Sequence, residues 1–177
     1  MNGFIVKISP ADGSFVDTDS ISFAVSADGR DEWITNVCED PNDKDSFYIV
    51  GGTMGTLDAT VKSAETDCTV RAFVSKLSVS SMKSLWTKQF SITQASGEDA
   101  EIGAALALGC DVISGDGLVY VAGVIGNGAS IDIDTEQQSL SGSDDIFVAQ
   151  LNTGNGAVKW LKQVGSNGVD RLARGGG

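Results

Sequence analysis

A short hydrophobic passage recurs three times along this 177-residue chain, and the recurrence constrains the fold more than any other feature. The copies read GFIVKI, AFVSKL and IFVAQL, and their phenylalanines are Phe4, Phe73 and Phe147. The spacing between copies is therefore 69 and then 74 residues. Self-similarity at a fixed period of this kind indicates a repeat architecture, in which each unit buries a face against the next.

Inside one period the landmarks keep their order. A tryptophan-centred run (Trp86, Trp160) follows the Phe-Val run, and a Tyr-Val-Gly run begins at Tyr48 and again at Tyr120, 72 residues later. Each run is short, rich in β-branched and aromatic residues, and bounded by Gly, Asp, Asn or Ser, which is typical of strands and their turns. The sequence therefore predicts an all-β protein.

Tight turns separate the predicted strands. Residues suited to a positive φ are supplied by Asp-Gly and Asn-Gly pairs, as tight hairpins require; the pairs end at Gly13, Gly29, Gly117 and Gly156. Four short antiparallel strands per period make one twisted sheet, which cannot bury both of its faces alone. Stacking successive sheets solves this problem in a β-propeller or a β-solenoid.

The length of the period decides between these two architectures. A solenoid coil uses about 20 to 30 residues, whereas a four-stranded propeller blade needs about 40 to 50. Longer excursions follow Gly55 and Gly126 before the next Phe-Val run. The period therefore favours a partial β-propeller of four-stranded antiparallel blades, about two and a half repeats long.

The order of these runs resembles that of the SBBP β-propeller repeats of large secreted and cell-surface proteins. The likeness is carried by FVAQL, NTGNGAVKWLKQVG, Gly-x-Asp and YVAG, and it covers almost the whole chain. It implies a scaffold or recognition module with no shared catalytic set. It also predicts three sequence units, at residues 1–72, 73–145 and, as an incomplete copy, 146–177.

A second resemblance concerns TGNGAVKW, from Thr153 to Trp160. It is similar to the tryptophan-docking element of quinoprotein (PQQ) propellers, in which the Trp of one blade packs on a neighbouring blade. A quinone would also require a calcium site, an Asp base and basic contacts, which no segment assembles, so we predict no cofactor. Trp33 breaks the period and either stacks on a sugar ring, anchors a partner or is buried in the first blade.

The chain contains no histidine. This excludes Ser-His-Asp and Cys-His catalysis and His-ligated zinc. A carboxylate pair remains possible, but among 24 acidic residues no spacing singles one out. The glycine-rich stretches at Gly51 and Gly123 lack the Lys-Ser/Thr of a phosphate-binding loop and precede no predicted helix. We therefore predict a protein that is not an enzyme.

Two acidic clusters present oxygen ligands at alternate positions, as calcium accepts from a loop. The first has a second interpretation as a lengthened, solvated hairpin turn, and the second as an edge strand whose carboxylates face water. Neither matches the EF-hand pattern, and we commit to no metal site. The first cluster consists of Asp40, Asn42, Asp43 and Asp45, and the second of Asp132, Asp134 and Glu136.

Three cysteines leave the disulfide state open. Cys38 and Cys110 lie 72 residues apart at comparable points of successive copies. Face-packed sheets would hold them about 10 Å apart, beyond the ~7 Å Cα separation that a disulfide spans, so we expect small buried apolar residues. Cys68 is expected to be free, or to pair with Cys38 or with a cysteine outside this sequence.

The net charge of −12 argues against nucleic-acid and anionic-membrane binding. An acidic surface favours solubility, calcium or basic partners, and no apolar stretch is long enough to cross a membrane. Two and a half blades cannot close a ring of four to eight, so we expect a piece of a longer polypeptide or an assembly of copies. We predict a secreted or cell-surface structural or protein-interaction module, with a calcium- or carbohydrate-binding domain and a propeller enzyme as alternatives.

Overall fold

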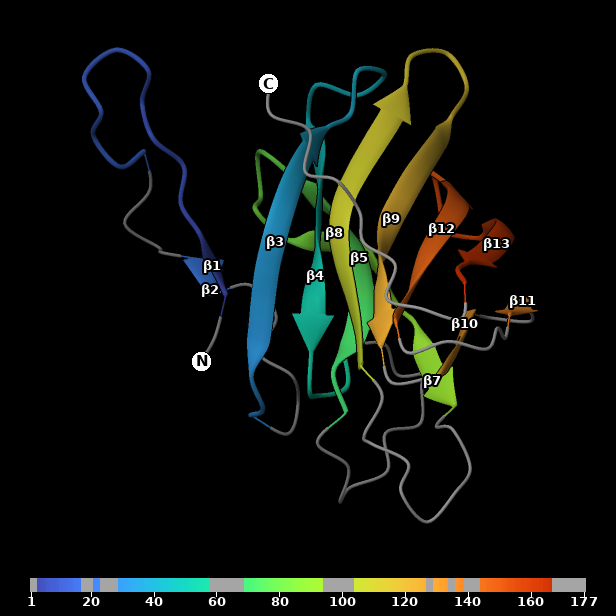
Figure 1. Cartoon of the computed structure of the whole chain (residues 1–177). Helices are drawn as coiled ribbons and strands as arrows, with labels where there is room; N and C mark the ends of the chain where they lie inside the picture. Colours follow the sequence, from blue (N-terminus) through green and yellow to red (C-terminus); the bar gives the residue numbers. More distant parts are fainter. Residues whose placement is uncertain are drawn as a thin grey trace.

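The computed structural model describes residues 3–16, 21–22, 29–57, 69–93, 104–126, 129–133, 136–138 and 144–166. Every regular element among them is a β-strand (Figure 1). The strands are β1 (Phe4–Ile5), β2 (Ile21–Ser22), β3 (Glu32–Glu39), β4 (Ser46–Thr53), β5 (Arg71–Ser78), β6 (Ser84–Gln89), β7 (Ser91–Thr93), β8 (Ala104–Ile113), β9 (Leu118–Gly126), β10 (Ser130–Ile133), β11 (Glu136–Gln138), β12 (Asp144–Asn152) and β13 (Val158–Val164).

Two four-stranded antiparallel sheets dominate the molecule. Sheet I has the order β3-β4-β5-β6, and sheet II has the order β8-β9-β12-β13. A pair formed by β1 and β2 and a small sheet of order β11-β10-β7 complete the described structure. The prediction of an all-β chain built from antiparallel sheets is therefore confirmed.

The two large sheets repeat one another strand for strand. Tyr48 of β4 lies opposite Lys76 of β5, and Tyr120 of β9 lies opposite Gln150 of β12. The fourth strand carries a bulge opposite the step from Lys76 to Leu77 in sheet I and opposite the step from Gln150 to Leu151 in sheet II, and the first strands β3 and β8 are also bulged. Bulges at matching positions bend both sheets in the same way.

The sheets are offset from the sequence repeats. The Phe-Val run forms the third strand of each sheet, β5 or β12, rather than the first. Sheet I therefore takes β3 and β4 from residues 32–53 and β5 and β6 from residues 71–89, on either side of a repeat boundary. This arrangement links successive sequence repeats within one hydrogen-bonded ladder.

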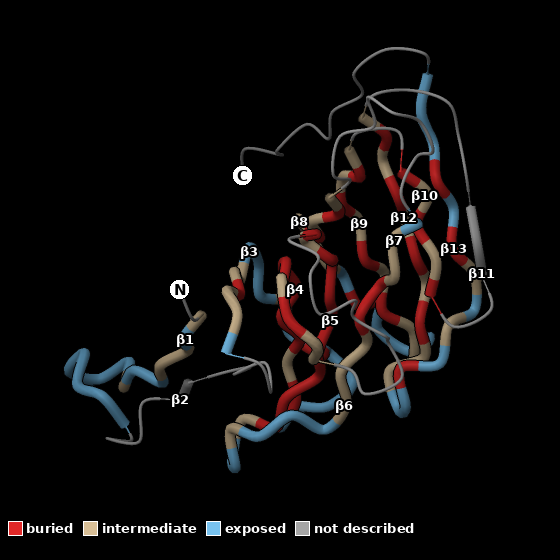
Figure 2. The backbone as a smooth tube through the Cα atoms, turned by 90° about the horizontal axis from the view of Figure 1, so that it is seen from below, coloured by how far each residue is buried: buried red, intermediate tan, exposed pale blue. Residues whose placement is uncertain are grey.

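Sheets I and II pack face to face and enclose the main core. Tyr48, Val50 and Val74 of sheet I are fully buried there, as are Phe147 and Leu151 of sheet II. In Figure 2 the sheets lie close together at β3 and β8, while β6 and β13 lie farther apart. A second cluster on the other face of sheet I is formed by Ile49, Phe73 and Leu77, with contributions from Ile5, Ile34, Phe47 and Leu57.

The small sheet contributes further apolar side chains to the main core. Ile131 and Ile133 of β10 are buried, and β10 lies between β7 and β11. The interpretation of this segment as an edge strand is therefore wrong. β10 pairs with β7 on one side and with β11 on the other, so both of its edges make backbone hydrogen bonds. Burial of Ile131 and Ile133 in the main core stabilises the strand in this position.

One glutamine in each large sheet holds an excursion in place. The Gln89 side chain accepts a hydrogen bond from the Leu57 N–H (2.8 Å) and donates one to the Gly55 carbonyl (2.8 Å). Gln163 makes the same pair of bonds with the Ile131 N–H and the Ala129 carbonyl. In both sheets a buried glutamine side chain thus satisfies a backbone N–H and a backbone carbonyl of the excursion, as a neighbouring strand would do.

Glycine serves different purposes in the turns and in the strands. All four predicted turn glycines have a positive φ, as at Gly156 (69°). Gly51 and Gly123, by contrast, lie inside β4 and β9, where a Cβ would stand 1.8 Å from the Trp33 carbonyl oxygen or 2.3 Å from that of Leu106. Both glycine-rich stretches therefore allow the bulged strand to approach closely, and neither precedes a helix in the described residues.

Within the described residues, no helix is long and apolar enough to span a membrane.

Candidate functional site

The junction between β3 and β8 joins equivalent positions of the two sheets. Thr35 places its hydroxyl within hydrogen-bonding distance of the Ala107 carbonyl, and the Asn36 amide donates to the Leu108 carbonyl (3.3 Å). Both contacts link residues 72 apart. The strands therefore run side by side in the register of the sequence repeat. At the β8–β9 turn, the side-chain oxygen Oδ1 of Asn42 accepts a hydrogen bond from the Gly115 N–H (2.6 Å).

Cys38 and Cys110 form a disulfide across this junction. The expectation that they are too far apart to pair is wrong, because their Cα atoms are 6.1 Å apart. The value of about 10 Å applies to the middle of two packed sheets, whereas the first strands of sheets I and II converge. Cys68 lies outside the described residues.

Trp86 of sheet I docks on the turn between β12 and β13 of sheet II. Its indole N–H donates to the Thr153 carbonyl (3.1 Å), and a Cβ on Gly156 would stand 2.8 Å from the indole ring. The turn from Thr153 to Gly156 therefore provides a carbonyl that accepts from the indole N–H. Because Gly156 has no side chain, the turn also leaves space for the indole ring. Trp86 therefore packs between the two neighbouring sheets.

A buried polar group lies next to this docking contact, and we call it the Lys76 cluster (Asp40, Asp43, Tyr48, Lys76). The Lys76 ammonium and the Tyr48 hydroxyl both donate to one oxygen of Asp40, at 3.0 and 2.9 Å. Asp43 lies 3.7 Å from the Lys76 ammonium. The Tyr48 ring contacts the Trp86 ring, with centroids 5.8 Å apart.

The environment of this cluster fixes its protonation states. Burial raises the pKa of Asp40, but hydrogen bonds from Lys76, the Asn42 N–H and Tyr48 outweigh burial and hold the pKa below its usual value. Burial, followed by the hydrogen bond to Asp40, raises the pKa of the Tyr48 phenol. At neutral pH Asp40 is therefore a carboxylate and Tyr48 a neutral phenol.

These protonation states suit neither Asp40 as a general acid nor Tyr48 as a general base or nucleophile. A general acid needs a raised carboxyl pKa, and a tyrosine base or nucleophile needs a lowered phenol pKa. Asp40 and Tyr48 show the reverse shifts. The chemistry of the Lys76 cluster is therefore that of a hydrogen-bonded ion pair that orients side chains between two sheets.

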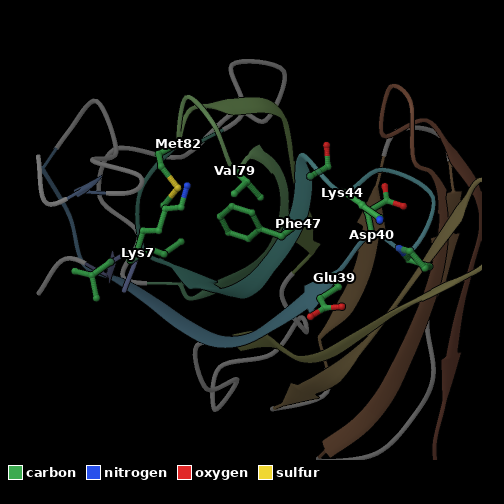
Figure 3. Close-up of a pocket in the computed structure, with 11 residues that line it drawn as sticks. Lys7, Glu39, Asp40, Lys44, Phe47, Val79 and Met82 are labelled. Carbon is green, nitrogen blue, oxygen red and sulfur yellow. The ribbon is translucent and has the colours of Figure 1, made fainter. Parts of the chain in front are cut away.

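A cavity of about 510 Å³ opens beside this cluster. Figure 3 shows Lys7 and Met82 at one end, Phe47 and Val79 in the middle, and Asp40 with Lys44 at the other end. Its apolar middle and charged ends fit an extended segment better than a compact polar ligand. The lining residues are Ile5, Val6, Lys7, Glu39, Asp40, Pro41, Lys44, Ser46, Phe47, Val79 and Met82.

The first predicted calcium cluster is a hairpin turn whose side chains bond within the protein. Asp40 is paired with Lys76, Asp43 accepts from the Ser46 hydroxyl (2.6 Å), and Asp45 accepts from the Ser80 N–H (2.8 Å). The interpretation as a turn is correct, but Asp40 is buried rather than solvated. Among the described residues, no three His, Cys, Asp or Glu side chains are arranged to hold a metal ion.

The second predicted calcium cluster is only partly described. Asp132 lies on β10 opposite Ser91 of β7 and is half-buried. Burial raises the pKa of Asp132, and the hydrogen bond with Ser91 lowers it to a smaller extent. Asp134 lies outside the described residues, as does the side chain of Glu136.

Trp33 is half-buried and lines a second cavity of about 570 Å³ between β3 and β8. The other lining residues are Ile34, Thr35, Val70 and Leu106. The Thr35 hydroxyl already lies within reach of two backbone carbonyls. The side chains that line this cavity therefore offer no further polar group to bind a sugar beside Trp33, and sugar binding by Trp33 stays a hypothesis.

Sequence reasoning missed Lys76 and Tyr48 as partners of Asp40. Their signal was present, because Tyr48 begins a periodic run and Lys76 occupies the polar position of a Phe-Val run. The pairing of Asp40 with Lys76 depends on the β3–β4 hairpin, whose turn places Asp40 beside β5. The sequence of one period does not predict this contact. The sequence also gave no sign that Gln89 and Gln163 bind the excursions.

No protein-family model matches this sequence, and a comparison with curated proteins found no match.

Proposed function

We propose that the chain is a non-enzymatic structural and protein-interaction module of a larger β-propeller protein built from SBBP-like repeats. One observation carries this proposal: β3 and β8 run side by side with contacts between residues 72 apart. Equivalent first strands meet in this way when successive sheets are related by rotation about an axis that runs along them. Repeating that rotation four to eight times closes a ring.

The internal chemistry supports a structural role over an enzymatic one. The Lys76 cluster joins ionisable groups by hydrogen bonds, and its pKa shifts suit neither Asp40 as a general acid nor Tyr48 as a general base. The absence of histidine from the sequence removes the commonest general base near neutral pH. In this proposal the sheets hold the loops rigidly, and partners bind to those loops and to the acidic surface.

The disulfide supports a location outside the reducing cytosol. Disulfides form and persist in secreted and cell-surface proteins and are rare in the cytosol of mesophiles. Cys38 and Cys110 join two sheets rather than two neighbouring loops. This is consistent with the extracellular or cell-surface location proposed for the larger protein.

A crystal structure tests the propeller geometry through the rotation that superposes sheet I on sheet II. Rings of four to eight sheets require a rotation of about 45° to 90° per sheet around a common axis beside β3 and β8. A rotation near 180°, or a pure translation, would contradict the proposal, because neither operation closes a ring.

Turnover and binding assays test the non-enzymatic part. The purified chain should hydrolyse none of a panel of polysaccharides, show no quinone absorbance and release no heat on titration with calcium. Calorimetric saturation with calcium, or turnover abolished by a single carboxylate variant, would replace the proposed role with one of the two alternatives predicted from the sequence.

A further inference from the structure

The cavity beside the Lys76 cluster is built from three separate stretches of the chain. Its lining residues belong to the β1 segment from Ile5 to Lys7, to residues 39–47 of the β3–β4 hairpin and to residues 79–82 of the β5–β6 turn. Phe47 and Ile5 also pack on the second hydrophobic cluster, on the other face of sheet I. The cavity therefore continues an apolar layer, and its volume of about 510 Å³ is that of a small-molecule site.

Met82 lines this cavity from a backbone conformation that does not favour a side chain. Among the described residues, it alone of the non-glycine residues has a positive φ (53°), and sheet II has Gly156 at the matching turn position. Backbone strain of this kind clusters at ligand sites. The strained turn keeps a side chain that reaches the cavity, and methionine adapts its shape to apolar ligands. The turn therefore points to a ligand that contacts Met82.

The polar groups of the cavity wall already have partners within the protein. The Ser46 hydroxyl donates to Asp43 (2.6 Å), and the Val79 N–H donates to the Asp45 carbonyl (2.7 Å). The carboxylate of Asp40 belongs to the ion pair described above. An extended peptide would need partners for its own backbone N–H and carbonyl groups, and these groups do not supply them. A hydrocarbon chain needs no such partners.

Three exposed charged side chains line the cavity, and two of them are lysines. Lys7 lies at the end with Met82 and Lys44 at the opposite end (Figure 3), and the third residue is Glu39. In the described part of the chain neither lysine forms an ion pair, although acidic residues outnumber basic ones by 24 to 12. An unpaired ammonium beside an apolar surface complements a ligand with an anionic head group.

The two lysines differ in the charges around them. Lys44 belongs to the turn from Asp40 to Asp45, which carries three aspartates. Lys7 belongs to a segment that has no acidic residue from position 1 to position 11. Carboxylates close to a cation weaken its attraction for a further anion. The anionic head group therefore belongs at Lys7.

We propose that this cavity binds the anion of a long-chain fatty acid. The carboxylate pairs with the Lys7 ammonium. The hydrocarbon chain lies along Met82, Val79 and Phe47, and each methylene that it buries strengthens binding by up to about fourfold. The inference goes beyond the proposed function and does not depend on the propeller geometry, because every wall belongs to sheet I or to the β1 segment.

Calorimetric titration of the full chain with sodium decanoate, below its micelle concentration, tests the site. We expect saturable binding of a single decanoate per chain. Octanoate, which lacks two methylenes, should bind up to about sixteenfold more weakly. Decanoyl-N-methylglucamide, which has the same hydrocarbon chain and a neutral head group, should also bind more weakly. A titration with no saturable heat, or equal affinity for the neutral analogue, would overturn the inference.

Methionine methyl signals locate the bound chain. In protein with ¹³C-labelled methionine methyl groups, decanoate should shift the signal of Met82. The signal of Met54, which does not line the cavity, should stay in place and serves as the internal reference. Saturable binding that leaves the Met82 signal unmoved would place decanoate elsewhere and contradict the assignment.

Three variants separate the head group from the chain. Lys7→Gln should weaken decanoate binding about fivefold, whereas the matched control Lys44→Gln should change it less than about twofold. Met82→Gly relieves the turn and so folds, yet it should bind decanoate at least about fivefold more weakly. Equal effects of the two lysine variants, or unchanged affinity in Met82→Gly, would overturn the inference.

An extended peptide is the other occupant that the titrations distinguish. Binding of a short peptide of alternating glutamate and leucine residues, with no binding of decanoate, would assign the cavity to a protein partner and overturn the inference. The rotation between sheets I and II is measured separately. A rotation in the range of a ring, combined with no decanoate binding, overturns this inference and leaves the proposed function standing.

Discussion

Sheets I and II are the same structure in two different environments. Both have the same ladder register, the same tyrosine–tryptophan pair and the same glutamine bonds to an excursion. Among the described residues, sheet I has a buried hydrophobic cluster on each face, whereas the buried cluster of sheet II lies on one face. The features common to both sheets therefore belong to the repeat itself, and the two sheets differ in the cluster on the second face of sheet I.

The polar interior is where the two sheets differ most. Sheet I pairs Lys76 with a buried Asp40, and sheet II has the neutral Gln150 at the position that matches Lys76. Desolvating two charges costs free energy that their attraction and hydrogen bonds offset only in good geometry. The neutral Gln150 in sheet II shows that the repeat does not require this ion pair.

Removing the disulfide should have the largest effect on this pairing of sheets. A cross-link between residues 72 apart contributes about 4 kcal/mol by the loop-entropy relation. The double variant Cys38→Ser, Cys110→Ser should lose about that much free energy of unfolding in urea titrations. Reduction of the unmodified chain should give the same loss, and an unchanged unfolding midpoint in both cases would show that no such cross-link forms.

A double-mutant cycle tests the ion pair against its neutral counterpart. Asp40→Val alone leaves a buried ammonium, and Lys76→Gln alone leaves a buried carboxylate, so each should cost about 3 kcal/mol in chemical denaturation. The double variant removes both charges, with the glutamine that sheet II has at this position of its third strand, and should cost about 1 kcal/mol or less. Additive losses in the double variant would mean that the two side chains do not interact.

Low pH should destabilise sheet I, because Asp40 becomes protonated and loses its ion pair with Lys76. The pKa of Asp40 is lowered in the folded protein, so its contribution to stability is complete above the ordinary value of 3.8 and is lost as the pH falls through the lowered pKa. Thermal unfolding followed from pH 5 to pH 2 should therefore show a smaller loss of stability in the double variant Asp40→Val, Lys76→Gln. Parallel curves for the two proteins would contradict the assigned shift.

The two periodic tryptophans should respond differently to the same substitution. Trp86→Phe removes the hydrogen bond to Thr153 and part of the docking contact, and we expect a loss of about 1 to 2 kcal/mol. Trp160→Phe should cost less than about 0.5 kcal/mol, because Trp160 is only half-buried beside Tyr120. Equal losses in denaturant titrations would mean that both indoles are already docked.

The smallest expected effect concerns the turns between the third and fourth strands. Met82 has a φ of 53° where sheet II has Gly156 at 69°. Left-handed backbone is costly for a residue with a Cβ, and glycine recovers part of that cost. Met82→Gly should therefore raise the unfolding free energy by about 0.5 kcal/mol, and Ser81→Gly at the preceding position is the matched control, which should give no gain.

The period, the strands and the turn glycines could all be predicted from the sequence. They depend on local alternation and on residues such as Gly156 whose backbone requirement is local. The offset between sheets and repeats could not be predicted in this way, because the Phe-Val run has the same alternation whether it forms the first or the third strand. Only the ladders of β4 with β5 and of β9 with β12 show its place.

The disulfide and the place of β10 were predicted wrongly for related reasons. The spacing argument used an average distance between sheets, and Cys38 and Cys110 lie where the sheets converge. The alternation of Ile131 with Asp132 indicates a half-buried strand, but it does not say how many neighbours the strand has. Both properties depend on tertiary arrangement, which a single sequence without related sequences does not encode in its local pattern.

Peptide mapping without reduction tests most directly that equivalent strands of successive repeats meet. Trypsin cleavage after Lys and Arg places Cys38, Cys68 and Cys110 in three separate peptides, spanning residues 31–44, 63–71 and 89–159. The account predicts a cross-linked species of the first and third peptides that separates on reduction. Recovery of Cys38 linked to Cys68, or of Cys38 and Cys110 both as free thiols, would contradict it.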